Sequence, residues 1–380
     1  MKIAIIGLGY VGLAVARSAH TSGLSVVGIE KDVDKVRKLG ETERFTVSSD
    51  YSLVANCEVV IIAVPTPLNE SREPDLSFLI SVCKSLKENL KSGTLVVNES
   101  TSYPGTLRSL IAPLLGDDYL YASAPERVDP ANTNWGIENT PRLVAGIGDK
   151  ATSKALLVYR TFCEHVVEVS SPEVAEAAKL FENTFRQVNI ALVNEFAQIS
   201  AALGISTFEI LQAAATKPFG FMSFAPSIGV GGHCIPVDPS YLSYAARAVG
   251  IDASFIDLAN KVNVSMPNYI ASRISELLDG SVSGKKIQIA GIAYKSDVAD
   301  TRESPALSLI EILREMGAEV TWCDEIVGNW SGEASTPLSA ADLGVIATAH
   351  SGVDYRAWKN TKTMVIDVST SSNTGWPKFL

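Results

Sequence analysis

Near its N-terminus the chain reads Lys2-Ile3-Ala4-Ile5-Ile6-Gly7-Leu8-Gly9-Tyr10-Val11-Gly12, and the helical pattern Leu13-Ala14-Val15-Ala16-Arg17 follows. The apolar run before the glycines is typical of a buried parallel strand. In the GxGxxG, Gly7 allows a tight turn and Gly9 lets the backbone approach a pyrophosphate. Gly12 lets the helix pack closely on the strand, with the helix N-terminus facing the phosphates.

A second apolar run, Leu24 to Ile29, ends in Glu30. An acid about 20 residues beyond the glycines can hydrogen-bond both ribose hydroxyls of a dinucleotide. A lone GxGxxG is weak evidence, because glycine turns also serve purely structural ends. Here the preceding strand, the following helix and the acid together predict dinucleotide binding. Glu30 should repel a 2′-phosphate, which favours NAD over NADP, although the cations Lys31 and Lys35 stand nearby.

Two further strands are expected over Val59 to Val64 and Thr94 to Val97. Each ends in a polar loop, Pro65-Thr66-Pro67 after the first and Glu99-Ser100-Thr101 after the second. In an open parallel sheet the ligand lies over the carboxyl ends of the strands. We therefore expect these loops to line the nicotinamide half of the cofactor; the alternative is that they are ordinary connecting turns.

The composition is that of a globular protein. The chain has 380 residues, 46% hydrophobic and 19% charged, with a net charge of -10. These values exclude a disordered chain and disfavour a nucleic-acid binder, and the length suggests two or three domains. With no apolar run of about 18 residues, no membrane insertion is expected. The N-terminus is interpreted as a first strand and not as a signal peptide.

The five cysteines are widely spaced and form no CxxC pair; they are Cys57, Cys83, Cys163, Cys234 and Cys323. An odd number without such pairing argues against a disulfide framework and against a zinc or other metal site. It fits the reducing cytoplasm, where we expect the protein.

A long helix is predicted to begin after Ser171, an N-cap followed by Pro172, and to run to about Leu203, before Gly204. Its length suits a bridge between domains or a dimer surface. Lys179, Asn183 and Arg186 share one face of it. They form either a solvated polar stripe or, since their neighbours are apolar, a set of functional groups in need of partners.

Residues 226–239 form a loop rich in glycine and proline that contains Gly231-Gly232-His233-Cys234 and Asp238. Glycines beside a cysteine leave room for a substrate to reach the sulfur, and their N–H groups can hold an anion. Cys234 is therefore a candidate nucleophile; the alternative is that it is an unreactive, buried thiol. For His233 a structural role is expected.

The last third repeats the strand–helix alternation. Apolar runs over 285–293, 319–322, 343–347 and 364–366, with a helix over 307–316, predict a second parallel sheet. This part has no GxGxxG, and Lys295 and Arg302 are its candidate anion-binding groups. The fold class is thus α/β in both halves.

Several separated motifs, in order, resemble the UDP-glucose/GDP-mannose dehydrogenase family over nearly the whole chain. They are Gly7-Leu8-Gly9-Tyr10-Val11-Gly12-Leu13, Val64-Pro65-Thr66-Pro67-Leu68, Glu99-Ser100-Thr101, Ala124-Pro125-Glu126-Arg127, Ala178-Lys179-Leu180-Phe181-Glu182-Asn183-Thr184, Gly231-Gly232-His233-Cys234 and Asp300-Thr301-Arg302-Glu303-Ser304-Pro305. The segments Cys234-Ile235-Pro236-Val237-Asp238-Pro239 and Thr216-Lys217-Pro218-Phe219-Gly220-Phe221-Met222 look like the branch acting on UDP-N-acetylhexosamines, with UDP-N-acetylglucosamine favoured.

The resemblance implies two Rossmann-like, doubly wound parallel-sheet domains joined by the long helix, which would also pair two subunits into a homodimer. The implied divisions are an NAD-binding domain over 1–170, a central helical region for dimerisation and catalysis over 171–270, and a C-terminal UDP-sugar-binding domain over 271–380.

It also implies a four-electron oxidation of the sugar C6 alcohol to the uronate by NAD, through a thiohemiacetal and a thioester on Cys234. Lys179 and Asn183 would supply an oxyanion site, Asp238 would position water, and Glu126 would be the base for thioester hydrolysis with Thr101 assisting. Further implied cofactor contacts are Gly7, Gly9, Tyr10, Val11, Gly12, Glu30, Lys35, Thr66, Ser100 and Arg302. The implied substrate contacts are Lys179, Asn183, Arg186, Lys217, Phe219, Gly231, Tyr294 and Lys295.

The chain departs from the family pattern in its last strand. The family tends to carry an arginine two residues after the aspartate there, and this chain has Asp367-Val368-Ser369. Arg142 is an arginine elsewhere that would replace it. Three alternatives stay open: a UDP-glucose or other nucleotide-sugar 6-dehydrogenase, a two-electron hydroxyacid-type dehydrogenase with no use for Cys234, and a catalytically weak protein that binds NAD and nucleotide sugar.

Overall fold

The computed structural model describes residues 1–129, 132, 134–371 and 374–380. The chain forms two compact units, which are described separately. Unit 1 comprises residues 1–182 and 240–252, and unit 2 comprises residues 183–239 and 253–380. Among the described residues, no helix is long and apolar enough to cross a membrane.

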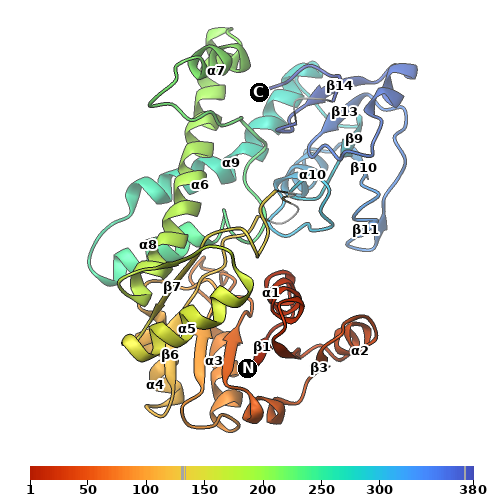
Figure 1. Ribbon diagram of the computed structural model, residues 1–380. Coiled ribbons are helices and arrows are strands. Elements are labelled where there is room, and N and C mark those ends of the chain that lie inside the picture. The colour runs from red at the N-terminus through yellow and green to blue at the C-terminus, as the bar shows by residue number, and fades with distance from the viewer. Residues whose placement is uncertain (130–131, 133, 372–373) are drawn as a thin grey trace. The chain divides into compact units, whose positions relative to one another are not determined.

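Unit 1 contains an eight-stranded sheet of order β3-β2-β1-β4-β5-β6-β7-β8 (Figure 1). Its strands are β1 (Lys2–Ile6), β2 (Ser25–Ile29), β3 (Thr46–Ser48), β4 (Val59–Ile62), β5 (Leu95–Asn98), β6 (Leu120–Ser123), β7 (Arg142–Gly146) and β8 (Val166–Glu168). The strands expected from the sequence are present within one or two residues. Neighbouring strands are parallel, as expected, except β6 and β7, whose antiparallel pairing the sequence did not indicate.

Helices cover both faces of this sheet. They are α1 (Tyr10–Thr21), α2 (Val33–Thr42), α3 (Ser77–Lys87), α4 (Ala112–Leu115) and α5 (Asp149–Phe162), with the short segments η1 (Tyr51–Asn56) and the π-helical η2 (Leu107–Ile111). Alternate strand residues such as Ile3 and Ile5 pack with α1 and α5 in one core. Their neighbours Ala4 and Ile6 are equally buried on the other face. Burial on both faces explains why these strands are apolar throughout.

The strand register brings the functional loops to one edge. Ile6, the last residue of β1, lies opposite Ile29 of β2 and Ile62 of β4, and Ile62 lies opposite Asn98 of β5. The residues that follow these strands therefore emerge side by side.

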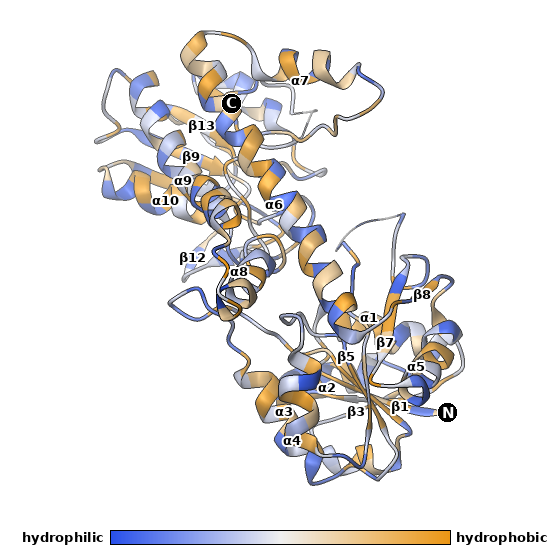
Figure 2. Ribbon diagram, turned by 90° about the vertical axis from the view of Figure 1, so that its left-hand side faces the viewer, coloured by the Kyte–Doolittle hydropathy of each residue, from blue (hydrophilic) through white to orange (hydrophobic). Residues whose placement is uncertain are grey.

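Unit 2 contains a four-stranded parallel sheet of order β10-β9-β13-β14 and a small hairpin. The strands are β9 (Lys286–Ala290), β10 (Glu319–Cys323), β11 (Asn329–Trp330), β12 (Glu333–Ala334), β13 (Leu343–Ile346) and β14 (Met364–Asp367). The helices of this region are α7 (Thr207–Ala215), α8 (Asp238–Ala248, largely in unit 1), α9 (Ser254–Leu277) and α10 (Pro305–Glu315), with the short η3 (Tyr355–Asn360). Figure 2 shows the hydrophobic character of β9 and β13 within this sheet.

The sheet of unit 2 starts with the same turn as the sheet of unit 1. Gly7 follows β1 with φ +88°, and its N–H donates to Ile29 O at 2.8 Å. Gly291 follows β9 with φ +81°, and its N–H donates to Cys323 O at 2.8 Å. Only glycine adopts such a φ readily. The expected second Rossmann-like sheet is thus confirmed without a GxGxxG.

The long helix is α6 (Pro172–Leu203), close to the predicted limits. The Val174 N–H donates to the Ser171 side chain at 3.4 Å, in keeping with the predicted N-cap. In unit 2, Asn194 of α6 donates to Asn263 of α9 at 3.0 Å, and its Oδ1 accepts the Ser227 N–H at 2.8 Å. These buried amides fasten the helix to α9 and to the start of the glycine-rich loop.

Candidate active site

The turn between β1 and α1 has the shape of a phosphate-binding site. A Cβ on Gly12 would stand 1.8 Å from Gly7 O, so only glycine fits there. A Cβ on Gly9 would meet no atom of the described chain within 4 Å. Space next to Gly9 is therefore open for a ligand. Tyr10, the first residue of α1, is 61% exposed, and Val11 follows it at the positive end of the helix dipole.

Glu30 stands beside this turn. Its Oε2 accepts the Leu8 N–H at 3.1 Å and pairs with Lys35 Nζ at 2.9 Å, and its Oε1 accepts the Lys31 N–H at 2.8 Å. Burial raises the pKa of Glu30, but Lys35 and the N–H donors lower it further, so the net shift is downward. The carboxylate is ionised at neutral pH and can accept ribose hydroxyls. The turn, the helix and this acid fit an NAD adenosine and pyrophosphate.

Glu30→Gln tests the predicted choice of cofactor. Removing the negative charge abolishes repulsion of a 2′-phosphate and leaves Lys31 and Lys35 to attract it. We expect NAD⁺ to bind about tenfold more weakly, the value of one charge-assisted hydrogen bond, and NADP⁺ to bind more tightly. Titration of both dinucleotides measures the ratio of the two Kd values. Glu41→Gln, an exposed site on α2, is the matched control; an unchanged ratio in Glu30→Gln would contradict the assignment.

The loops after β4 and β5 lie at the same edge of the sheet. Ser100 Oγ accepts the Val64 N–H at 2.9 Å and so ties these two loops together. Thr66 O accepts a hydrogen bond from the Tyr241 hydroxyl at 3.0 Å, which anchors its loop to α8. Thr101 follows Ser100 and is half-buried. Unit 1 thus brings Thr66, Ser100 and Thr101 to the edge that Gly7 and Glu30 occupy.

Glu126 and Lys179 both belong to unit 1 and are 5% and 7% exposed. The Glu126 carboxylate accepts the Val128 N–H. The neighbouring Arg127 makes a two-bond pair with Glu182 of α6, at 2.9 and 2.5 Å, and donates to Pro141 O at 2.9 Å. This pair, which the sequence analysis missed, fixes the Glu126 loop on the helix that carries Lys179.

Cys234 belongs to unit 2 and lies four residues before the first residue of α8. Its carbonyl accepts the N–H groups of Val237 and Asp238 at 3.2 and 2.8 Å, which forms a tight turn. Asp238 is fully buried, and its Oδ2 accepts Asn183 Nδ2 at 2.6 Å. Unit 2 therefore brings three predicted catalytic residues together, and Asn183 stands one helical turn after Lys179 on α6.

The other four cysteines differ from Cys234 in exposure. Cys57, Cys83, Cys163 and Cys323 are buried, whereas Cys234 is partly exposed. Burial raises the pKa of Cys83 to about 12 and, as its largest cause, that of Cys323 to about 11. Such thiols are poor nucleophiles at neutral pH. Cys234 is thus the cysteine with a partly accessible sulfur among the five, and its role as a nucleophile stays a prediction.

The glycines before Cys234 pack against two further predicted ligand residues. A Cβ on Gly231 would stand 2.8 Å from Tyr294 Cβ, and one on Gly232 would stand 2.7 Å from the Tyr294 ring. Gly232 N donates to Arg302 O at 2.9 Å. The Arg302 side chain, 48% exposed, pairs with Asp300 at 2.5 Å. Burial and the nearby Arg302 lower the pKa of His233, in keeping with a structural role.

Other predicted substrate residues lie outside this cluster or at its border. Lys217 and Phe219 follow α7, with the Lys217 ammonium 4.9 Å from the Phe219 ring centre and the ring 71% exposed. Arg186 is exposed on α6, and Lys295 is half-buried beside Tyr294. Among the described residues, no group of three or more His, Cys, Asp or Glu could hold a metal ion.

At the end of β14, a lysine stands where the family pattern suggested an arginine. Lys378 Nζ contacts Asp367 Oδ2 at 2.8 Å and donates to Ser369 O at 2.7 Å. Arg142 does not take the place of that arginine, because it is buried in unit 1 and paired with Glu99. The C-terminal segment itself supplies a cation at this strand end.

Three family models match the chain. They are the NAD binding domain of the UDP-glucose/GDP-mannose dehydrogenase family over residues 37–163, its central domain over residues 173–265 and its UDP binding domain over residues 288–371.

Curated relatives and solved structures of similar length also match. A UDP-N-acetyl-D-mannosamine dehydrogenase of Pyrococcus horikoshii is 34% identical, covering 95% of this chain and 92% of the relative. A UDP-N-acetyl-D-glucosamine 6-dehydrogenase of Pseudomonas aeruginosa is 32% identical, covering 92% and 91%. The solved structure of the P. horikoshii UDP-D-ManNAc dehydrogenase has a TM-score of 0.86 at 33% identity, covering 97% of this chain and 95% of that one.

Proposed function

Since this chain belongs to the UDP-glucose/GDP-mannose dehydrogenase family and is an NAD-dependent nucleotide-sugar dehydrogenase, we propose that it oxidises the C6 alcohol of a UDP-N-acetylhexosamine to the uronate. UDP-N-acetylglucosamine is the favoured substrate, on the Thr216-to-Met222 and Cys234-to-Pro239 segments. UDP-N-acetylmannosamine is the second candidate, because several relatives carry that name. The observation that carries the proposal is the hydrogen bond from half-buried Asn183 to fully buried Asp238, four residues after the partly exposed Cys234.

The balanced reaction consumes one alcohol, two NAD⁺ and one water and yields the carboxylate, two NADH and three protons. NAD⁺ supplies the hydride acceptor of each oxidation. The residues proposed to hold it are Gly7, Gly9, Tyr10, Val11, Gly12, Glu30, Lys35, Thr66, Ser100 and Arg302.

Cys234 Sγ adds to the carbonyl carbon of the C6 aldehyde while the C=O π bond breaks and the thiol proton passes to the former aldehyde oxygen, which gives the thiohemiacetal. The second oxidation converts this adduct to a thioester, which water cleaves to release the carboxylate and the thiol. Lys179 and Asn183 donate hydrogen bonds to the oxygen on C6 wherever it carries negative charge. Asp238 orients water, and Glu126 accepts the proton of that water while Thr101 assists near the reacting carbon.

NADH yield tests this function directly. Limiting UDP-N-acetylglucosamine with excess NAD⁺ is expected to give two NADH per sugar at 340 nm, with UDP-N-acetylmannosamine, UDP-glucose and GDP-mannose in parallel. One NADH per sugar would overturn the four-electron reaction in favour of a two-electron dehydrogenase. No NADH with any of these sugars, despite NAD⁺ binding, would overturn the proposed activity.

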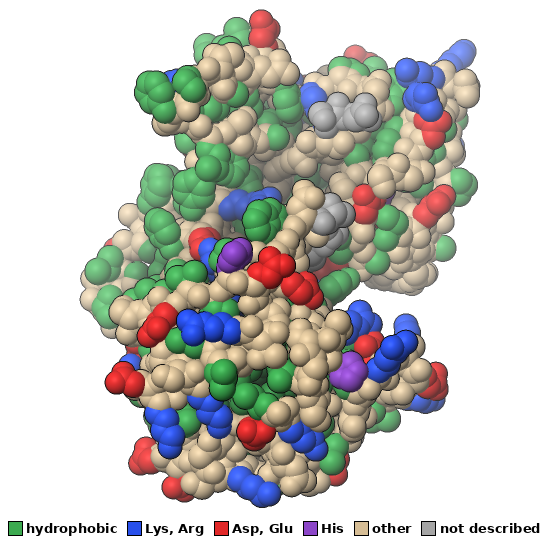
Figure 3. Space-filling model, viewed as in Figure 1, with side chains coloured by type: hydrophobic (Ala, Val, Ile, Leu, Met, Phe, Trp, Pro, Cys, Tyr) green, Lys and Arg blue, Asp and Glu red, His purple; other side chains and the backbone are tan. Residues whose placement is uncertain are grey.

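The proposal includes a homodimer formed through α6. Along this helix the exposed apolar side chains Phe181, Phe185, Leu192, Ile199 and Leu203 recur at spacings of four and seven residues, as on one face of a packed helix. Figure 3 shows further hydrophobic side chains gathered over α7 and α9 of unit 2. Light scattering is expected to give twice the chain mass of 40.5 kDa; a monomer would contradict the dimer.

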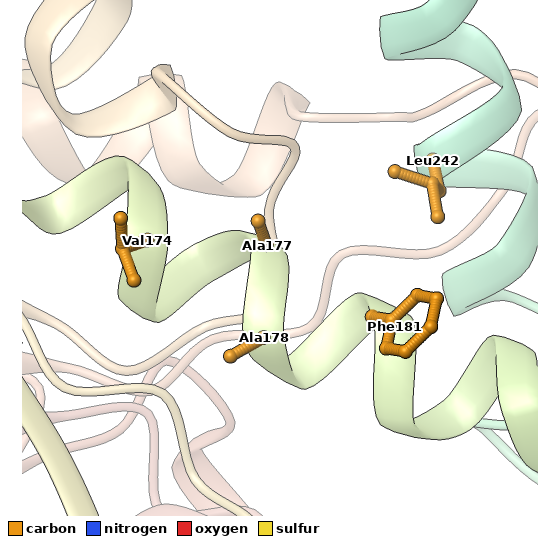
Figure 4. A pocket seen from close by; sticks show the side chains of 5 residues that line it. All are labelled: Val174, Ala177, Ala178, Phe181 and Leu242. Carbon is orange, nitrogen blue, oxygen red and sulfur yellow. The ribbon is translucent and has the colours of Figure 1, made fainter.

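An apolar hollow in unit 1 lies on the same helix, α6, and supports the proposal that this helix forms a dimer interface. It is lined by Val174, Ala177, Ala178 and Phe181 of α6 and by Leu242 of α8, and Figure 4 shows these side chains around it. With no polar group among these side chains, the hollow suits an apolar side chain and not a nucleotide.

The proposal also includes the predicted domain boundaries at residues 170 and 270 and the predicted cytoplasmic location.

A further inference from the structure

A buried charge pair lies beneath the cofactor edge of unit 1. Glu99 directly follows β5 and is 1% exposed, and Arg142 is the first residue of β7 and is 2% exposed. Arg142 Nη1 stands 3.4 Å from Glu99 Oε2. The other Glu99 oxygen accepts a hydrogen bond from the Tyr159 hydroxyl of α5. Neither NAD binding nor the proposed chemistry uses these groups directly.

Arg142 also reaches the loop that carries Glu126. Its Nη1 donates to Ala124 O at 3.1 Å, two residues before Glu126. Burial lowers the pKa of Arg142, but the charges of Glu99 and Glu126 outweigh it and raise the pKa overall. The guanidinium therefore stays charged and interacts with carboxylates on both loops.

Glu99 connects the pair to the loops with Ser100 and Thr101. The backbone N–H groups of Glu99 and Ser100 both donate to Ile62 O, at 2.9 and 3.1 Å. Asn98 Nδ2 donates to Ser100 O and to Ser102 Oγ, each at 3.1 Å. A displacement of Glu99 would thus move the turn on which Thr101 lies.

The stability of the fold does not by itself explain why Glu99 and Arg142 are charged. Replacing a buried ion pair by apolar groups of similar volume is often neutral or stabilising, whereas removing one partner is strongly destabilising. We propose that Arg142, held by Glu99, is a positioning residue that fixes the Thr101 loop and the Glu126 loop relative to each other for NAD binding and turnover. The part that concerns turnover rests on the proposed function.

Three variants separate positioning from folding. Arg142→Met removes one charge and leaves Glu99 uncompensated, the double variant Glu99→Gln with Arg142→Met removes both, and Arg142→Lys keeps a cation. Arg160→Met, which removes an exposed arginine of α5, is the matched control. For each protein we would measure Tm, the Kd of NAD⁺, and kcat and KM with the UDP-sugar.

We expect Arg142→Met to lower Tm and the double variant to recover it. Both should lose at least about tenfold in kcat, with the KM of the sugar changed by less than about twofold, because misplaced catalytic groups slow a reaction without releasing the substrate. Arg142→Lys should recover part of kcat. A double variant with wild-type kcat and NAD⁺ affinity would overturn the proposal and leave the pair a purely structural one.

Failure of the proposed function would be recognised separately. If the wild-type protein produces no NADH with any sugar, the Kd of NAD⁺ for the double variant still tests whether the pair positions the cofactor loops. A loss of at least about fivefold in the folded double variant supports positioning of the cofactor loops, and an unchanged Kd overturns it.

Discussion

Cys234→Ser should lower uronate formation by at least about a thousandfold while NAD⁺ and UDP-sugar binding persist, in keeping with the cost of removing a covalent nucleophile. A serine hydroxyl is far less nucleophilic than a thiolate and forms no thioester. The backbone turn is retained, because the N–H groups of Val237 and Asp238 bind the carbonyl of residue 234 and not its side chain. NADH per sugar, with product masses after quenching, is the measurement.

Cys57→Ser is the matched control for that experiment. Cys57 is buried, and its Sγ stands 3.6 Å from Leu53 O, a hydrogen bond that a hydroxyl can replace. This variant should keep wild-type turnover. Two NADH per sugar at an undiminished rate from Cys234→Ser would show that the reaction needs no covalent adduct on this residue.

Gly12→Ala should disrupt the cofactor site and reduce NAD⁺ affinity by at least about tenfold. The added Cβ would stand 1.8 Å from Gly7 O, a backbone atom, so α1 must move away from β1. Overpacking of this kind costs about 1–3 kcal/mol and lowers Tm by several degrees. Thermal unfolding and NAD⁺ titration measure both effects.

Substitutions of two other glycines distinguish a loss of NAD⁺ binding caused by contact with the ligand from one caused by a disturbed fold. Gly9→Ala meets no atom of the described chain within 4 Å, so it should keep Tm and still weaken NAD⁺ binding. Gly40→Ala, in the open on α2, should change neither binding nor activity. Wild-type NAD⁺ affinity in both Gly9→Ala and Gly12→Ala would place the dinucleotide elsewhere.

The sequence predicted those features that depend on local signals. The limits of α6 follow from Ser171, Pro172 and Gly204, and the turn after β1 follows from the spacing of its glycines. The antiparallel pairing of β6 and β7 was missed, because strand direction depends on the path of the intervening chain.

The missed site contacts join distant parts of the chain. Arg127 and Glu182 are 55 residues apart, and no periodicity relates them. The pairing of Arg142 with Glu99 arises because the start of β7 lies near the end of β5 in the sheet. No local signal shows this, so the sequence offered Arg142 only as a replacement for the arginine expected after Asp367. Lys378 at Asp367 likewise depends on the return of the C-terminal segment to β14.

The repeated glycine turn has a consequence for how one chain handles two nucleotides. In unit 1 the acid beside the turn, Glu30, is only partly buried and accepts the Leu8 N–H. Its counterpart in unit 2, Asp324, is 1% exposed and accepts the N–H groups of Ile292 and Ala293, at 2.8 and 3.0 Å, and stands 3.1 Å from His350 Nε2. The chain's own donors thus surround the buried Asp324, whereas Glu30 stays partly exposed, so the two equivalent turns offer a nucleotide different surfaces.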